Sequence, residues 1–265
     1  MAKFGTRAVR QVAGAFTSCI AILLLGNQPG STEPAKTADD GRRIHTFSGV
    51  PIRLPRFLSN PKAYSLSPNT VVHLVRTPAD TCGLYTWGVF KMSSGEGPPP
   101  HIHYADQEWF LTEQQGGVRI FLPRHKTAKL VPGQIPGINA PVQPMGSALI
   151  PPNSAVYSPK AIVHYYTNES GQTIDSFHNV WEPGFGIIKI FEIFDQATRS
   201  GQRLSNDDLL KQTGLWGVPH SGDGSMTGTT QFRLIRDPIA RPIETNLKQL
   251  QELIDRGERC FPGDH

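Results

Sequence analysis

The chain has 265 residues, of which 38% are hydrophobic, 18% are charged and 13 are Phe. This composition is too apolar and too weakly charged for a wholly disordered protein. The net charge of +4 includes Lys3, Arg7 and Arg10 of a leader without acidic residues, and no basic stripe follows, so nucleic acid is not an expected partner. The 26 Gly and 23 Pro favour a loop-rich β fold over a helical bundle.

Residues 1–30 have the pattern of a targeting segment, because their basic residues precede an apolar run from Val12 to Gly26. The run is shorter than the about 20 apolar residues of a membrane-spanning helix and matches the core of a signal peptide. The sequence therefore predicts a signal peptide and a secreted or extracytoplasmic protein. An uncleaved membrane anchor and a disordered tail on a cytosolic protein are the alternatives, because no clear cleavage site follows the run.

Residues 31–44 are predicted to form a linker, because they are polar and carry turn-forming residues. Cys82 and Cys260 are the cysteines that follow the leader. In an exported protein they could form one disulfide, and two unpaired thiols are the equal alternative. The absence of a CxxC motif argues against a cysteine zinc site.

Residues 45–195 predict an all-β domain. Short segments with β-branched and aromatic residues and partial alternation are separated by turn signals such as Pro98-Pro99-Pro100 and Gly116-Gly117. Many short antiparallel strands indicate a sandwich or barrel. The predicted strands are Thr46–Arg53, Val71–Arg76, Leu84–Met92, His101–His103, Glu108–Thr112, Val118–Phe121, Ala148–Ile150, Val156–Tyr157, Ile162–Thr167 and Ile174–Trp181.

The pattern changes after Pro183, and residues 196–265 are predicted to form a C-terminal extension of helices and loops. Predicted helices cover Ile187–Ala197, the segment from Ser205 to Leu210, which starts with a capping-box-like pattern, and Ile243–Gly257, where apolar residues recur at helical spacing. The extension could cover the barrel and form a homodimer contact, or it could be a lid over the barrel mouth.

His101 and His103 are separated by one residue on a predicted strand, so their side chains are expected on the same face. Glu108 follows after a short connection that could bring its carboxylate alongside. Two imidazoles and a carboxylate are suitable ligands for Fe, Mn, Ni, Cu or Zn. His164, in a later predicted strand, suggests a fourth ligand.

The spacing of these residues resembles the cupin superfamily, whose first motif is G-x5-H-x-H-x(3,4)-E-x6-G. Gly95, His101, His103 and Glu108 stand at the matching intervals, and Gly116 comes one residue late. The second motif is G-x5-P-x-G-x2-H-x3-N. The residues that match it in type are Gly146, Pro152, His164 and Asn168.

The second motif departs from the pattern in two ways. Ser154 replaces its glycine, and His164 comes seven residues late, since Tyr157 stands where the histidine is usual. We therefore predict an insertion within Ser154–Lys160 and retain His164 as the ligand. A three-ligand site near Tyr157 is the alternative, although Tyr is a rarer ligand than His.

The resemblance implies a single double-stranded β-helix, or jelly-roll barrel, with a divalent metal held by His101, His103, Glu108 and His164. Among cupins the chain resembles quercetinase-like dioxygenases, which use three His and one Glu on flavonol-type substrates, although fungal quercetinases usually have two barrels. Fe2+ is the expected metal, and Mn2+, Ni2+ and Cu2+ are alternatives. Glu108 is the candidate general base, because a carboxylate ligand can also accept a proton.

Strand parity predicts the substrate pocket. Phe110 and Thr112 share the face of Glu108, and Ile162 and Tyr166 share the face of His164. This wall suits a flat or aromatic molecule. Trp109 and Tyr165 are expected on the outer face. The other histidines are predicted to be solvated (His45, His125, His220 and His265) or structural (His73 and His178).

The sequence thus predicts a metal-dependent dioxygenase that consumes O2 and a small aromatic or enol-type molecule. A germin-like oxidase or decarboxylase, or a cupin isomerase, is the second hypothesis. A cupin that binds a metal or ligand without catalysis is the third. An apolar pocket wall argues against an oxalate-type substrate, which would prefer polar residues.

Overall fold

The protein is described from a computed structural model, which describes residues 42–58, 60–123, 145–220, 237–238 and 243–261. These residues belong to one compact unit, residues 40–265. The predicted signal peptide, residues 1–30, and His125 and His265 lie outside the described residues. None of the helices in the described ranges is long and apolar enough to span a membrane.

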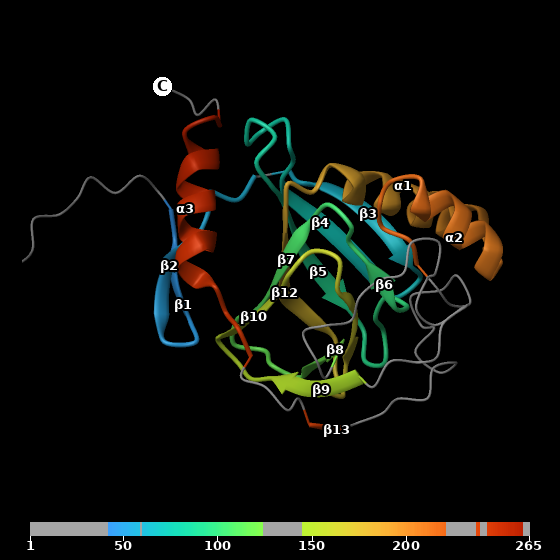
Figure 1. Ribbon diagram of the computed structural model, residues 1–265, viewed down its shortest axis with the longest axis horizontal. Helices are drawn as coiled ribbons and strands as arrows, with labels where there is room; N and C mark the ends of the chain where they lie inside the picture. The colour runs from blue at the N-terminus through green and yellow to red at the C-terminus, as the bar shows by residue number, and fades with distance from the viewer. Residues whose placement is uncertain (1–41, 59, 124–144, 221–236, 239–242, 262–265) are drawn as a thin grey trace, which may run out of the picture. The chain divides into compact units, whose positions relative to one another are not determined.

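Two sheets form the barrel (Figure 1). In the antiparallel six-stranded sheet the spatial order is β10 (Ser154–Ser158), β7 (Gln107–Thr112), β12 (Ile174–Glu182), β5 (Thr86–Met92), β4 (Thr70–Arg76) and β3 (Lys62–Ser67). In the five-stranded sheet it is β13 (Asp237–Pro238), β9 (Met145–Ile150), β8 (Val118–Pro123), β11 (Val163–Asn168) and β6 (His101–Ile102), where β13 pairs in parallel with β9 and the other pairs are antiparallel.

The helices in the described ranges are α1 (Phe185–Ser200), α2 (Asn206–Gly214) and α3 (Leu247–Glu258). Ser205 caps α2 as its sequence predicts, because its hydroxyl accepts a hydrogen bond from the Asp208 backbone N–H at 3.1 Å. The predicted all-β barrel with a C-terminal helical extension is therefore confirmed.

The predicted strand Thr46–Arg53 is wrong, because it is a hairpin of β1 (Ile44–Phe47) and β2 (Val50–Arg53). Ser48 and Gly49 form the turn with φ of 48° and 81°, the left-handed region that glycine favours. Strand β3 was not predicted from the sequence, since it is short, carries three serine or lysine side chains among its six residues and shows burial at Tyr64 and Leu66.

The main hydrophobic core lies inside the barrel and continues under α1. Phe90 packs edge-on against Tyr166, Trp181 and Phe191, at ring-centroid distances of 6.2 to 6.3 Å. Helix α1 buries one face against this core, with Ile187, Ile190, Phe191, Phe194 and Ala197. Figure 1 shows α1 beside β3 and α2 next to α1, away from α3.

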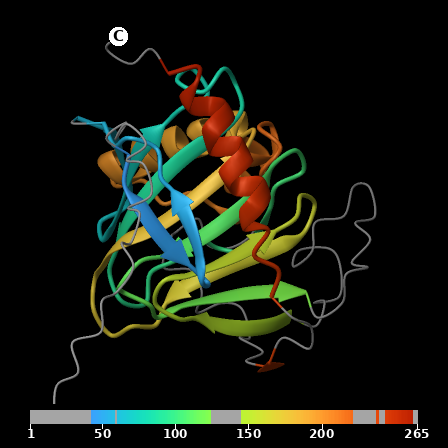
Figure 2. The same ribbon diagram turned by 90° about the vertical axis from the view of Figure 1, so that its left-hand side faces the viewer.

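A second core lies on the outer face of the six-stranded sheet, where α3 and the β1–β2 hairpin pack (Figure 2). Trp109 is fully buried in it, together with Leu250 and Ile254 of α3. The prediction that Trp109 lies on the outer face is thus confirmed. Tyr165 also lies outside the main core, stacked on Phe121 at 4.3 Å.

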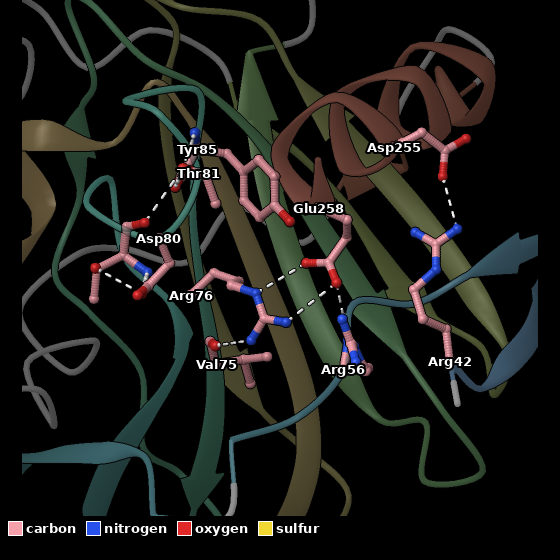
Figure 3. A network of polar contacts seen from close by, with 10 residues as sticks. Arg42, Arg56, Val75, Arg76, Asp80, Thr81, Tyr85, Asp255 and Glu258 are labelled. Atoms are coloured by element: carbon pink, nitrogen blue, oxygen red, sulfur yellow. Dashed lines mark hydrogen bonds and ion pairs between the residues drawn. The ribbon is translucent and has the colours of Figure 1, made fainter. Parts of the chain in front are cut away.

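The end of α3 is fastened to the barrel in two ways. A disulfide joins Cys82, in the β4–β5 connection, to Cys260, 178 residues later. Glu258 of α3 accepts hydrogen bonds from the fully buried Arg76 guanidinium at 2.9 and 3.2 Å (Figure 3). Arg76 also lies over the ring of Phe261, 4.0 Å from its centroid. These contacts join the last described residues to the end of β4.

His178 is structural, as the sequence predicts. Its buried Nδ1 accepts a hydrogen bond from Trp87 Nε1 at 3.2 Å, and its Nε2 donates to Glu113 at 2.9 Å. Burial lowers the pKa of His178, so the folded protein keeps a neutral ring. Glu113 has a pKa of about 2, because His178 and Arg43 outweigh the effect of burial.

These shifts predict acid sensitivity. His178 binds a proton less readily in the folded chain than in the unfolded chain, where histidine titrates near pH 6.5. The folded protein therefore loses stability as the pH falls through this value, by up to about 1.4 kcal/mol per pH unit. The measurement is the free energy of unfolding at pH 7.5 and 5.5 with a chelator present. The decrease should be smaller in His178→Gln, and an equal decrease in both proteins would contradict the prediction.

Candidate metal centre

Four buried side chains converge between the two sheets: His101, His103, Glu108 and His164. Their candidate ligand atoms all lie within 4.8 Å of one another, and the group could hold a metal ion. His101 and His164 face each other as paired residues of β6 and β11, with ring centroids 4.4 Å apart. Glu108 comes from β7 of the other sheet, and His103 directly follows β6.

The loop before β6 is held by two neighbouring residues. Glu96 is buried, and its carboxylate accepts hydrogen bonds from Ser67 at 2.8 Å and Thr70 at 3.1 Å. Gly97 passes so close to β11 that a Cβ there would lie 1.9 Å from the carbonyl oxygen of Tyr166. Any other residue at position 97 would push this loop, and with it His101, away from β11.

Two of the imidazoles are oriented by the same kind of hydrogen bond, from Nδ1 to a nearby backbone carbonyl. The Nδ1 of His101 donates to the carbonyl of Pro99 at 2.9 Å, and that of His164 donates to the carbonyl of Ile162 at 3.0 Å. In each case the acceptor is two residues earlier in the chain. With the proton on Nδ1, the Nε2 lone pair faces the centre, which is the form that binds a metal.

His103 is oriented differently. Its Nδ1 lies 3.5 Å from the Asp106 carboxylate, and neither of its ring nitrogens has a hydrogen-bond partner in the structure, although the ring is 1% exposed. The Asp106 carboxylate also accepts a hydrogen bond from the Gly184 backbone N–H at 3.0 Å, directly before α1. A buried imidazole without partners is costly unless it binds something.

Glu108 completes the set. One carboxylate oxygen, Oε1, accepts a hydrogen bond from Asn179 Nδ2 at 2.7 Å, and Oε2 lies 2.9 Å from His164 Nε2 and 3.3 Å from His103 Nε2. The Nδ1 of His164 already carries a proton, which it donates to Ile162. A cation between the Nε2 of His164 and the Glu108 carboxylate satisfies both groups without a second proton on the ring. The residues therefore fit a divalent metal ion.

The pKa of His101 lies well below its ordinary value, because the ring is buried and three other histidines, His164, His220 and His103, surround it. Its imidazole is therefore neutral at physiological pH. A neutral imidazole is what a metal ion needs as a ligand, since the lone pair of a protonated ring is occupied.

A small cavity of about 20 Å³ borders three of the four side chains, His101, His103 and Glu108. This volume holds one or two water molecules. Its polar end has His101, His103, Glu108 and His220, and Tyr166 lies at the wall. The rest of the wall is apolar and is supplied by the barrel and by α1: Leu66, Phe90, Pro98, Trp181, Ile187, Ile190, Phe191 and Phe194.

Of the four predicted pocket residues, Tyr166 lines this cavity. Phe110 packs behind the site, edge-on against His164 at 5.5 Å and stacked on Phe177 at 6.3 Å. Thr112 lies further along β7 than the part that borders the cavity. Its hydroxyl donates to the carbonyl of Pro151 at 2.6 Å. Ile162 precedes β11 and contributes its carbonyl to His164 rather than a side chain to the cavity.

Strand parity predicts the face on which a residue lies but not the depth at which it lies. The apolar wall comes instead from other barrel residues and from α1, whose contribution the sequence did not indicate. Helical spacing predicts an apolar face for α1, but not the surface that this face covers.

His164 comes later in the chain than the second motif requires, and β10 and the turn after it contain the extra residues. Tyr157 of β10 points to the outer face, where its ring packs on Trp109 at 5.1 Å and its hydroxyl donates to Gln107. His164 is thus the residue that belongs to the cluster. The alternative site near Tyr157 is not formed.

His220 is the residue that the sequence analysis missed. It was expected to be solvated, yet it is 3% exposed and its ring stacks on His101, with centroids 4.5 Å apart and planes inclined by 9°. Burial lowers its pKa to about 3. Its neighbours in sequence, Pro219 and Gly222, suggest a loop, and no local pattern indicates that this loop returns to β6.

No family model and no curated protein matches the chain. Among solved structures the chain is similar to KdgF from Halomonas sp., at 12% identity over 48% of this chain and 93% of that one, with a TM-score of 0.34. It is also similar to an RmlC-like cupin from Shewanella frigidimarina, at 8% identity over 50% of this chain and 93% of that one, with a TM-score of 0.35.

A third similar structure is a salicylate 1,2-dioxygenase from Pseudaminobacter salicylatoxidans, at 12% identity over 40% of this chain and 24% of that one, with a TM-score of 0.28. The likenesses are distant. The two-sheet barrel and the four converging residues agree with the fold and the metal site that the two sequence motifs predict.

Proposed function

We propose that the protein is a metal-dependent cupin oxidoreductase, a dioxygenase that acts on a small aromatic or enol-type molecule. The observation that carries the proposal is the convergence of three imidazoles and one carboxylate beside a largely apolar cavity. When bound, a redox-active metal such as Fe2+ supplies Lewis acidity and electron transfer toward O2. Mn2+, Ni2+ and Cu2+ suit the same ligands.

Glu108 has the second role, that of a proton acceptor. Its Oε1 accepts a hydrogen bond from Asn179, its Oε2 lies 3.3 Å from His103 Nε2, and the side chain lines the cavity. A substrate with an acidic enol or phenol hydroxyl would lie within reach of this carboxylate, and loss of that proton makes the substrate electron-rich. Glu108 is therefore proposed both as a ligand and as the general base.

Tyr166 is proposed to orient the substrate. Burial raises the pKa of its hydroxyl well above the ordinary value, so the group stays protonated. The oxygen accepts a hydrogen bond from Asn179 at 3.3 Å, which leaves the proton for an oxygen atom in the cavity. The apolar wall around it excludes water and favours an uncharged ring over a small dianion.

A second candidate function is a cupin that binds a metal or a ligand without turnover. The small volume of the cavity favours it, since about 20 Å³ does not admit an aromatic ring unless α1 moves. An oxidase, decarboxylase or isomerase would use the same centre. These activities differ in whether they need O2 and a substrate.

The test is O2 uptake by protein of known metal content, with a panel of phenols, catechols, flavonols and enols. Substrate-dependent uptake that is lost in Glu108→Gln supports the dioxygenase. Turnover without O2 would instead indicate an isomerase or decarboxylase. A stoichiometric metal with no turnover on the panel would support the binding protein.

We also propose that the protein is exported. The leader pattern supports this, and so does the disulfide between Cys82 and Cys260, because such bonds persist in oxidising compartments. A homodimer is the proposed assembly. Mass spectrometry of the secreted chain and light scattering would test the two proposals separately.

A further inference from the structure

The segment that carries His220 pairs with β6, the edge strand of the five-stranded sheet, and this pairing brings His220 to the metal centre. In that sheet β6 stands at one end, and the segment 217–220 lies along its open side. The backbone N–H of Tyr104 donates to the Gly217 carbonyl at 3.0 Å, and His220 forms an antiparallel bridge with His101. The His220 backbone N–H in turn donates to Thr213 at 3.0 Å. The backbone of His220 is thus fixed from both sides.

The ring of His220 is fixed as firmly as those of the candidate ligands. Its Nδ1 donates to the carbonyl of Val218, two residues earlier, at 2.8 Å, which is the same kind of hydrogen bond as at His101 and His164. Phe194 of α1 packs edge-on against the other side of the ring at 5.5 Å. With the proton on Nδ1, Nε2 keeps its lone pair.

No hydrogen bond to Nε2 of His220 occurs within the described ranges, and the side chain lines the cavity beside His101. The rings of His220 and His101 are stacked, with their planes inclined by 9°. The cluster of candidate ligand atoms contains His101 and not His220. His220 presents an acceptor next to the centre, without being part of it.

We propose that His220 is a positioning residue of the metal centre, where its Nε2 accepts a hydrogen bond from a ligand held in the cavity beside His101. The inference rests on the metal centre of the proposed function. A neutral acceptor at this place favours ligands that carry a proton on the bound atom, such as water or a hydroxyl group. It disfavours bare anions, which have no proton to donate and whose charge the lone pair repels.

The test uses Co2+ as the metal and azide as a small bare anion. His220→Phe keeps a ring against His101 and Phe194 and removes the acceptor, whereas His220→Gln keeps an acceptor and removes the ring. His73→Phe is the control, since His73 lies in β4 and does not line the cavity. Azide is titrated into each Co2+-loaded protein and followed by the visible cobalt absorption.

All four proteins should bind one Co2+ per chain. Azide should bind about threefold to tenfold more tightly to His220→Phe than to the wild type, as expected when one hydrogen bond to the competing water is lost. His220→Gln should remain close to the wild type, and His73→Phe should match it. If His220→Phe does not fold, His220→Leu replaces it in the same comparison.

Three results would overturn the inference. Equal azide affinity in His220→Phe and the wild type would show that the lone pair does not face the ligand. Loss of Co2+ in this variant would make His220 a ligand instead. An equal change in azide affinity in His220→Gln and His220→Phe would show that loss of the ring, and not loss of the acceptor, causes the effect.

The titration needs neither O2 nor substrate, so it separates this inference from the proposed function. A protein that shows the azide effect but takes up no O2 overturns the dioxygenase alone. A wild-type chain that binds no Co2+ overturns both.

Discussion

Purified His101→Ala should contain almost no bound metal under conditions in which the wild type holds one ion per chain. Loss of an outer partner of a metal ligand already lowers metal affinity by about 10- to 100-fold, and loss of a ligand itself should cost at least as much. His101 is buried, and the hydrogen bond from its Nδ1 to Pro99 directs its Nε2 at the centre. Elemental analysis and equilibrium dialysis measure the effect.

His73→Ala is the matched control for this substitution. His73 is also a strand histidine, but it lies in β4, outside the cluster of candidate ligands. It should keep full metal content. Near-ultraviolet circular dichroism checks that both variants are folded. A His101→Ala protein that binds metal with wild-type affinity would refute the site.

Glu258→Gln should destabilise the protein by about 3 kcal/mol or more, with the disulfide intact. It leaves the guanidinium of Arg76 buried without a carboxylate, and breaking such a pair from one side typically costs about 3–5 kcal/mol. The side chain of Arg76 is 0% exposed and that of Glu258 is 10% exposed, so water compensates little. Chemical denaturation under non-reducing conditions measures the change in the free energy of unfolding.

Glu192→Gln is the control, because its ion pair with Lys189 on α1 is exposed on both sides, at 38% and 47%. Exposed pairs contribute about 0–1 kcal/mol, so the control should change little. Replacing both charges, with Arg76→Met and Glu258→Leu together, should restore much of the lost stability. Equal, small effects in Glu258→Gln and Glu192→Gln would show that the buried pair does not hold α3.

Several features of the site could be read from the sequence because they depend on local spacing. His101, His103 and Glu108 lie within eight residues, and one strand and one turn suffice to bring them together. His164 followed from a less regular motif. The structure accommodates its late position with β10 and a turn, and pairs it directly with His101 across two strands.

The lining of the cavity could not be read in the same way. Phe110 and Ile162 have the right parity, but whether a side chain lines a cavity or fills the core behind it depends on what packs opposite. That partner is α1, and its Phe191 and Phe194 approach from a segment that follows the barrel in sequence. Long-range packing of this kind leaves no periodic signal in the strands.

The sequence by itself determined the strand-rich class, the order of the helices and the identity of the four candidate ligands, since each depends on composition or on short spacings. The tertiary structure decided that Cys82 pairs with Cys260, that α1 covers the centre and that His220 stands beside His101. The physical reason is the same in each case: these contacts join segments far apart in the chain, and their partners are selected by burial and packing rather than by neighbours in sequence.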